Sequence, residues 1–83
     1  MRATVLVRPK RGILDPQGQA VASSLRQLGF AVDEARVGRV VDLEVEASDP
    51  ADARAQLERM CEQLLANPLI ETFEIDVPGV PTP

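Results

Sequence analysis

The 83-residue chain contains no histidine, tryptophan or tyrosine, only two phenylalanines and a single cysteine. Without histidine, the sequence offers neither an imidazole general base nor a conventional zinc site. The one cysteine, Cys61, cannot form an internal disulfide. A domain of this size buries only about 60% of the surface that its unfolded chain exposes. We therefore expect the chain to depend on association with other subunits.

Long hydrophobic runs are also missing, so the sequence predicts no membrane-spanning segment. The N-terminal residues follow a strand-like pattern instead of that of a signal peptide, and we expect a cytoplasmic protein. The net charge of −4 disfavours nucleic-acid binding. Binding of that kind needs a basic surface and stacking platforms, and only Phe30 and Phe73 could stack on a base.

The charged residues are unevenly distributed along the chain. Residues 1–40 carry seven basic and three acidic residues, a net charge of +4, whereas residues 41–83 carry two basic and ten acidic residues, a net charge of −8. Surfaces of opposite sign favour docking on a second copy or on another subunit. A mixed, solvated surface is the alternative, because exposed ion pairs contribute little to stability.

The first part of the chain predicts a strand followed by a helix. Residues 3–7 are aliphatic and β-branched, and the strand should end at Pro9, since proline cannot donate a hydrogen bond to a sheet. Asp15 and Pro16 predict a helix start, with Asp15 as the N-cap and Pro16 at the first helical position. Apolar residues at helical spacing continue the helix to Gly29, a typical left-handed stop.

The segment 30–47 alternates between apolar and polar positions, but its apolar positions change from even to odd numbers near Gly38. A change of face requires a hairpin turn or a bulge, and glycine tolerates both. The segment is therefore either two strands or one long bent strand. The outward positions of its second part are acidic, which is typical of a sheet with one solvated face; they are Asp42, Glu44 and Glu46.

A second helix and a last strand follow. Asp49 and Pro50 repeat the helix-start pattern. The apolar stripe of this helix consists of Leu57, Met60, Cys61, Leu64 and Leu65. The helix should end at Asn67-Pro68, and residues 69–77 alternate as a strand does. The last six residues, 78–83, contain three prolines, and we expect a tail that is either frayed or lies on a partner as an extended segment.

The resulting order, β-α-β(β)-α-β, predicts an α+β fold. A small antiparallel sheet of three or four strands would carry two helices on one face. Residues 1–77 would form this single domain, followed by the proline-rich tail at 78–83. The uncovered face of a small sheet is completed most simply by a second copy, so we expect a homodimer formed through the sheet, with tetramers as a further step.

No residue pattern points to catalysis within this chain. Cys61 lies on the apolar stripe without a histidine to activate it, and we expect it in the core. The acidic residues of 42–46 lack the loop that would wrap a cation. The loop at 10–12 precedes a helix N-terminus, where phosphate groups can bind, but no nucleotide-binding motif is present. We therefore predict no catalytic, cofactor-binding or metal-binding residues here.

The segment 8–20 reads Arg-Pro-Lys-Arg-Gly-Ile-Leu-Asp-Pro-Gln-Gly-Gln-Ala. It resembles the signature of the PurS family, the small S subunit of phosphoribosylformylglycinamidine synthase, in which a basic-Gly-aliphatic-Leu-Asp-Pro-Gln-Gly run opens the first helix. The resemblance covers nearly the whole chain, through Leu28-Gly29-Phe30 and Val37-Gly38 to Asn67-Pro68. Arg39 departs from the family pattern, which usually has lysine after this glycine.

The resemblance implies a non-catalytic assembly subunit of a ligase complex in de novo purine biosynthesis. In that family the small subunit joins an ATP-using synthetase subunit and a glutaminase subunit. The complex converts formylglycinamide ribonucleotide, glutamine and ATP into formylglycinamidine ribonucleotide, glutamate, ADP and phosphate. The small subunit would bridge the other two and help to enclose the ammonia route, while ATP, ADP and Mg²⁺ would belong to the synthetase subunit.

On the same basis we predict two points of partner docking. The docking residues would be Lys10, Arg11 and Gly12 in the first loop, and Arg36, Gly38 and Arg39 at the change of face. The alternative for the glycines is turn geometry alone. The helix-capping residues Asp15, Pro16, Asp49 and Pro50 would be structural. Two rival hypotheses are a free-standing dimeric small-molecule-sensing module of ferredoxin-like type and a small acyl-phosphate or phosphate-ester enzyme.

Overall fold

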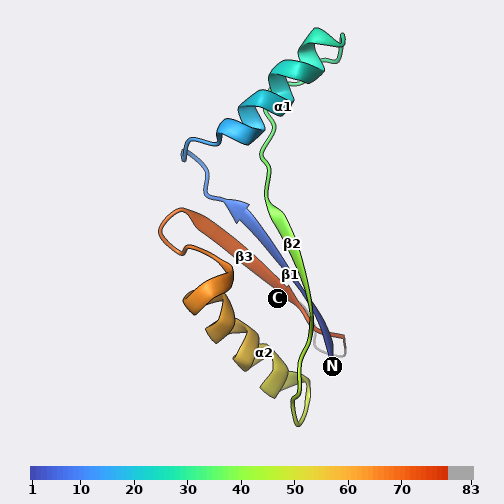
Figure 1. The fold of residues 1–83 in the computed structure, drawn as a ribbon, viewed down its shortest axis with the longest axis vertical. Coiled ribbons are helices and arrows are strands. Elements are labelled where there is room, and N and C mark those ends of the chain that lie inside the picture. The colour runs from blue at the N-terminus through green and yellow to red at the C-terminus, as the bar shows by residue number, and fades with distance from the viewer. Residues whose placement is uncertain (79–83) are drawn as a thin grey trace.

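The computed structural model describes residues 1–78 of the chain. These residues form three strands and two α-helices, the second of which continues into a short π-helix (Figure 1). In chain order the elements are β1 (Arg2–Pro9), α1 (Pro16–Gln27), β2 (Arg39–Glu44), α2 (Pro50–Met60), η1 (Cys61–Leu65) and β3 (Glu71–Asp76). Within this described part, no helix is long and apolar enough to cross a membrane.

The three strands form one antiparallel sheet with β1 in the centre, in the order β2-β1-β3. Val5 of β1 lies opposite Val41 of β2 and Ile75 of β3, so that the apolar positions of all three strands share one face. We call this the inner face and the opposite one the open face. The antiparallel sheet and the two helices confirm the predicted α+β fold.

The core lies between the inner face and α2 (Figure 1). Its largest fully buried side chains are Leu57, Val5, Val7, Val77 and Cys61. The stripe predicted for the second helix therefore supplies two of the five. On the open face, Thr4 and Leu6 of β1 are partly exposed and Arg8 is exposed.

The predicted placement of both helices on one face of the sheet is wrong for α1. Only α2 covers the sheet, and α1 extends beyond its end, which gives a molecule 50 Å long and 24 × 21 Å across (Figure 1). The width of the sheet explains the difference. Three strands spaced about 4.8 Å apart form a surface hardly wider than one helix of about 10 Å diameter. Within α1, only Gly18 and Ala22 are buried.

Only one strand forms within 30–47, and it is neither of the two predicted arrangements. Residues 30–38 cross from α1 back to the sheet without strand pairing, and β2 begins at Arg39. The guanidinium of Arg26 holds the first part of this crossing by donating to the carbonyls of Val32 and Asp33, both at 2.7 Å. The change of face near Gly38 thus marks the point at which the chain begins to pair with β1, and the chain makes no hairpin turn there.

The second helical segment ends at Leu65, earlier than the predicted end at Asn67, because its last turn, η1, is a π-helix instead of an α-helix. The amide of Ala66 donates to the carbonyl five residues before it, that of Cys61, at 3.0 Å. A π-type turn rotates the chain less per residue than an α-helix does. Leu64, expected on the buried stripe, consequently lies 83% exposed.

The last strand is shorter than the range 69–77 that its sequence predicts. Leu69 and Ile70 belong to a turn in which the amides of Ile70 and Glu71 donate to the carbonyl of Asn67. The strand itself starts at Glu71. Of the predicted tail, only Pro78 falls within the described residues, and 79–83 lie outside them.

Candidate functional site

The loop between β1 and α1 is fixed by backbone hydrogen bonds. The amide of Lys10 donates to the carbonyl of Ile70 at 2.8 Å, which ties the loop to the turn before β3. The amide of Ile13 donates to the carbonyl of Lys10 at 3.2 Å and closes a turn. Within it Gly12 has a φ of +81°, which side-chain-bearing residues rarely adopt. The turn leaves Lys10 and Arg11 exposed.

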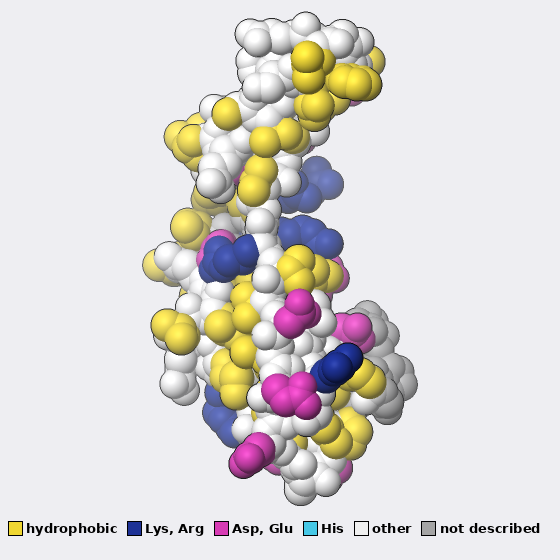
Figure 2. Space-filling view, turned by 45° about the vertical axis from the view of Figure 1, so that its right-hand side comes forward, with side chains coloured by type: hydrophobic (Ala, Val, Ile, Leu, Met, Phe, Trp, Pro, Cys, Tyr) yellow, Lys and Arg dark blue, Asp and Glu magenta, His cyan; other side chains and the backbone are white. Residues whose placement is uncertain are grey.

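Arg36, from the second predicted docking point, lies beside the first. Its Nη1 donates to the carbonyl of Pro9 at the end of β1, at 3.2 Å. Lys10, Arg11 and Arg36 consequently line one surface hollow, although the whole of α1 separates Arg36 from the loop in the sequence. Figure 2 shows basic side chains around the narrow part between α1 and the sheet, with acidic ones further along the sheet.

Arg8 and Thr72 line the same hollow and were not among the predicted site residues. They lie opposite each other on β1 and β3. The alternation of β1 contains a signal for Arg8, because it shares a face with Thr4 and Leu6. No comparable signal exists for Thr72, since its position opposite Arg8 depends on strand register.

Gly38 has a packing role at the junction with the sheet. A Cβ atom at this position would collide with the carbonyl oxygen of Val7 in β1. The close approach allows β2 to pair with β1 directly afterwards, starting at Arg39 opposite Val7. Gly38 is therefore required by backbone packing, whether or not a partner is present.

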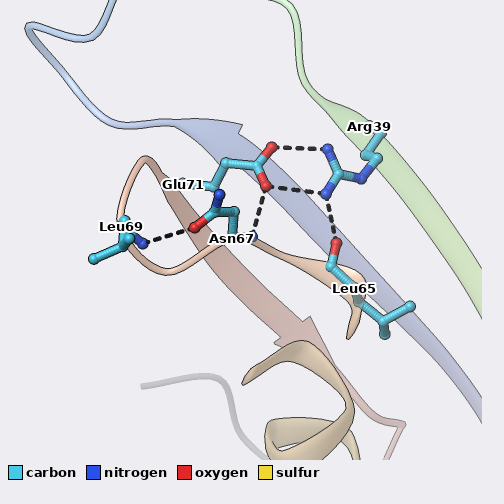
Figure 3. Close-up of polar contacts among 5 residues, drawn as sticks. All are labelled: Arg39, Leu65, Asn67, Leu69 and Glu71. Carbon is cyan, nitrogen blue, oxygen red and sulfur yellow. Dashed lines mark hydrogen bonds and ion pairs between the residues drawn. The ribbon is translucent and has the colours of Figure 1, made fainter. Parts of the chain in front are cut away.

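Arg39 forms the most extensive polar contact on the inner face, shown in Figure 3. Its two terminal nitrogens donate to both carboxylate oxygens of Glu71 at 2.7 and 3.0 Å. Nη2 also donates to the carbonyl of Leu65 at 2.6 Å. The carboxylate of Glu71 accepts a further bond from the amide of Asn67 at 2.7 Å. Arg39 thus connects β2 with the end of η1 and the start of β3.

The same contacts change the acidity of both partners. The hydrogen bonds from Arg39, followed by that from the Asn67 amide, lower the pKa of the Glu71 carboxyl. The hydrogen bond to Glu71 raises the pKa of Arg39. The Glu71 side chain is 16% exposed and that of Arg39 is 49% exposed, so the pair is only partly shielded from water. The structure thus assigns Arg39 an internal contact.

Asp15 connects α1 with the crossing segment. One carboxylate oxygen accepts from the amide of Gly18 at 3.0 Å, and the other accepts from the amide of Val37 at 2.9 Å. The bond from Val37, and next the one from Gly18, lower the pKa of Asp15. Gly18 itself lies against the carbonyl of Ala35, where a Cβ atom would collide. Pro16 occupies the first turn of the helix.

The second helix has a similar start. The side chain of Asp49 accepts from the amide of Asp52 at 2.8 Å, and Pro50 opens the helix. Asp52 in turn accepts from the amide of Ser48 at 3.1 Å. That bond is the main cause of the lowered pKa of Asp52. Asp49, Pro50, Asp52 and the amide of Ser48 thus organise the start of α2. None of these residues lines the hollow formed by Lys10, Arg11 and Arg36.

Cys61 is fully buried in the core. Burial, and to a smaller extent the charges of Glu58 and Glu62, raise the pKa of its thiol. A buried thiol with a raised pKa is a weak nucleophile at neutral pH. Among residues 1–78, no cluster of three acidic or cysteine side chains could hold a metal ion.

A group of exposed apolar side chains was not among the predicted site residues. Ile13, Leu14 and Ile70 line a groove at the base of α1. Further along the helix, Val21, Leu28 and Phe30 are exposed, on or next to α1. Their helical spacing is visible in the sequence, but it also fits a buried helix. Only the position of α1 away from the sheet shows that they are uncovered.

Comparisons with known proteins agree on one family. The sequence profile of PurS, described as phosphoribosylformylglycinamidine (FGAM) synthase, matches residues 2–79. The PurS subunit of phosphoribosylformylglycinamidine synthase from Synechocystis is 46% identical over 77 residues, which are 92% of this chain and 75% of that protein. The PurS subunit from Bacillus subtilis is 38% identical over 80 residues, or 95% of this chain and 94% of that one.

Solved structures give the same result. Methanocaldococcus jannaschii PurS superimposes with a TM-score of 0.82 at 34% identity, covering 96% of this chain and 98% of that one. A chain in the structure of PurLQS from Thermotoga maritima superimposes with a TM-score of 0.83 at 32% identity, covering 90% and 93%. Because these matches span almost the whole chain in sequence and in fold, the chain belongs to the PurS family.

Proposed function

We propose that this chain is the small subunit of phosphoribosylformylglycinamidine synthase and acts in de novo purine biosynthesis. The observation that carries the proposal is the full-length similarity to PurS subunits, one of them within a PurLQS structure. The subunit would bridge the glutaminase and synthetase subunits and help to enclose ammonia transfer. This similarity favours the assembly subunit over the free-standing sensing module.

The chain would supply surface to the complex, and the catalytic groups would come from the other subunits. Two features support this division. The single thiol is buried, and the sequence contains no histidine. ATP, ADP and Mg²⁺ would bind to the large synthetase subunit, as the family resemblance implies. The whole complex would work in the cytoplasm.

We also propose that the chain forms a homodimer, with tetramers as a further step. The uncovered apolar side chains on and next to α1 favour this helix as the main contact, since Leu28 is 73% and Phe30 59% exposed. Burying side chains of this type stabilises an interface by about 1.5–3 kcal/mol each. The open face carries mostly charged residues, so dimerisation through the sheet, as first expected, stays a prediction with less support.

Partner docking at Lys10, Arg11, Gly12, Arg36, Gly38 and Arg39 stays a prediction as well. Three of these residues have an internal role: Gly12 in its turn, Gly38 against β1 and Arg39 with Glu71. The neighbouring side chains Ile13 and Leu14 are exposed and apolar. We therefore propose that the partner subunits contact the loop mainly through these two residues.

Co-purification with the glutaminase and synthetase subunits tests the proposed function. We expect the three chains to form one complex in the presence of glutamine, Mg²⁺ and ADP, and glutamine-dependent synthesis to require this chain. Leu14→Asp should reduce complex formation at least about tenfold, because a buried carboxylate without a partner is costly. Leu64→Asp, at a similarly exposed position on η1, is the control. Equal synthesis with and without the chain would reject the proposal.

A further inference from the structure

Two adjoining hollows lie on the open side of the sheet, where the end of β1 meets β2 and β3. One has a volume of about 380 Å³ and is lined by Arg8, Lys10, Arg11, Arg36 and Thr72, with Glu74 at its edge. The other has a volume of about 420 Å³ and includes Leu6 and Val40. Arg8 and Arg36 line both, so the two hollows are continuous. Both are open to solvent, so a ligand would lie across them on the surface of the sheet.

The first hollow concentrates positive charge in a chain whose net charge is −4. Four basic side chains face one acid, Glu74, which already forms an ion pair with Arg8 at 2.8 Å. The side chains of Lys10 and Arg11 have no hydrogen bond or ion pair with other described residues. Arg36 uses only Nη1, on the carbonyl of Pro9. Most of the donors in this hollow are therefore available to a ligand.

Three local features fix the backbone segments that carry these side chains. Lys10 is tied to Ile70 by its amide, and Gly12 allows the turn that follows. Gly38 brings the Arg36 segment against β1. Guanidinium groups on a fixed frame suit phosphate oxygens, because their paired N–H donors match two oxygens at once.

The second hollow offers a different surface. Leu6 and Val40 lie directly opposite each other on β1 and β2. They are apolar positions on a face that otherwise carries charged and hydroxyl side chains, and Val40 is 59% exposed. A ligand that reaches from the basic hollow to this pair would need both a phosphate end and a less polar end.

We propose that the two hollows form a binding site for a small phosphate-bearing molecule of nucleotide size. Its phosphate groups lie between Lys10, Arg11 and Arg36, and its less polar part lies over Leu6 and Val40. The proposal goes beyond the assembly role, which requires no ligand on this chain. The basic side chains lie around one open hollow of about 380 Å³, and this small extent favours a small ligand over an acidic protein segment, which would contact a broader surface.

The test is a titration of the full, ¹⁵N-labelled chain with ADP and with pyrophosphate, followed by NMR. We expect saturable shifts at the amides of 10–12 and 38–40. The double variant Lys10→Gln/Arg36→Gln should weaken binding of both probes at least about tenfold, since each change removes a charge-assisted hydrogen bond. Both side chains are exposed, so the fold should be retained. Val40→Ser should weaken ADP binding and leave pyrophosphate binding unchanged.

The matched control is Arg2→Gln/Arg59→Gln, which removes the same charge from exposed positions outside the hollows. Equal weakening by both double variants would mean non-specific attraction and would overturn the proposal. Absence of saturable binding at millimolar concentrations would overturn it too. Loss of synthetase binding in Lys10→Gln/Arg36→Gln, with binding of ADP and pyrophosphate intact, would also overturn the proposal. The two hollows would then dock an acidic protein. A chain that binds ADP but never joins its partners would refute only the proposed function.

Discussion

At the scale of single residues, Arg39 was predicted to contact a partner subunit, but its guanidinium binds Glu71 of the same chain. The bidentate geometry holds three separate segments together, and it depends on the planar fork of arginine. A lysine at this position could not donate to both carboxylate oxygens and to Leu65 in the same way, so the contact is specific to arginine.

We expect Glu71→Gln to lower the free energy of unfolding by about 1 kcal/mol at neutral pH, because a partly buried, charge-assisted contact is lost. The pKa of Glu71 lies below its ordinary value of 4.5 in the folded chain. Its stabilising contribution is therefore present above that value and is lost as the pH falls through the folded pKa. Urea unfolding between about pH 2 and pH 7 should show a shallower decline of stability in acid for the variant than for the unmodified chain. Identical slopes for both proteins would contradict this reading.

Gly38 gives a second prediction at this scale. Gly38→Ala should destabilise the fold by about 1–3 kcal/mol, because the new Cβ would collide with the Val7 carbonyl and displace the start of β2. Thermal unfolding measures the effect. Gly12→Asn is the comparison, since Gly12 has a positive φ, which asparagine tolerates, but no atom within 4 Å of an added Cβ. A melting temperature for Gly38→Ala equal to that of the unmodified chain would refute the packing role.

At the scale of elements, α1 owes its position to few contacts. Asp15 bonds to the amides of Gly18 and Val37, and Gly18 packs on the carbonyl of Ala35. The rest of the helix extends away from the sheet. A helix held mainly at one end should respond strongly to changes at that end.

Asp15→Ala should therefore loosen α1 and leave the sheet intact. We expect faster hydrogen exchange at the amides of Gly18 and Val37, because both lose their acceptor, and a lower helix content by circular dichroism. Amides within β1 should keep their protection. Asp15→Asn, which retains a side-chain acceptor, should have a smaller effect. Equal protection of the Gly18 amide in both variants and in the unmodified chain would rule out the proposed anchor.

At the scale of the whole molecule, the elongated shape separates two surfaces. Most of the large exposed apolar side chains lie on α1 and around its base, and the open face of the sheet carries the hollows and mostly charged residues. A dimer through α1 would leave the open face free for a ligand. A dimer through the sheet would cover Val40 and the hollow beside it.

Sedimentation of two variants distinguishes these dimers. Leu28→Glu should convert the proposed dimer into a monomer, because it places a charge in the apolar contact on α1. Val40→Glu, at a similarly exposed position on the open face, should leave the dimer intact. The reverse result would support dimerisation through the sheet and contradict the role of α1. Both positions are exposed in the single chain, so neither change should unfold it.

The sequence by itself determined the local features of this protein. Asp15-Pro16 and Asp49-Pro50 predict the two helix starts, and the alternation in 69–77 predicts the buried face of β3, because caps and side-chain periodicity depend only on neighbouring residues. The segment 8–20 also identifies the family, since its motif is contiguous in the chain.

Only the tertiary structure decided how these elements are used. The sheet is too narrow for a second helix, so α1 lies beyond its end and its apolar side chains stay uncovered. The π-type turn moves Leu64 off the buried stripe, and strand register places Arg8 opposite Thr72. Arg39 binds Glu71 on the inner face of the sheet, while Lys10, Arg11 and Arg36 line one hollow. These outcomes depend on distances between residues far apart in the chain, which periodicity and local propensity do not encode.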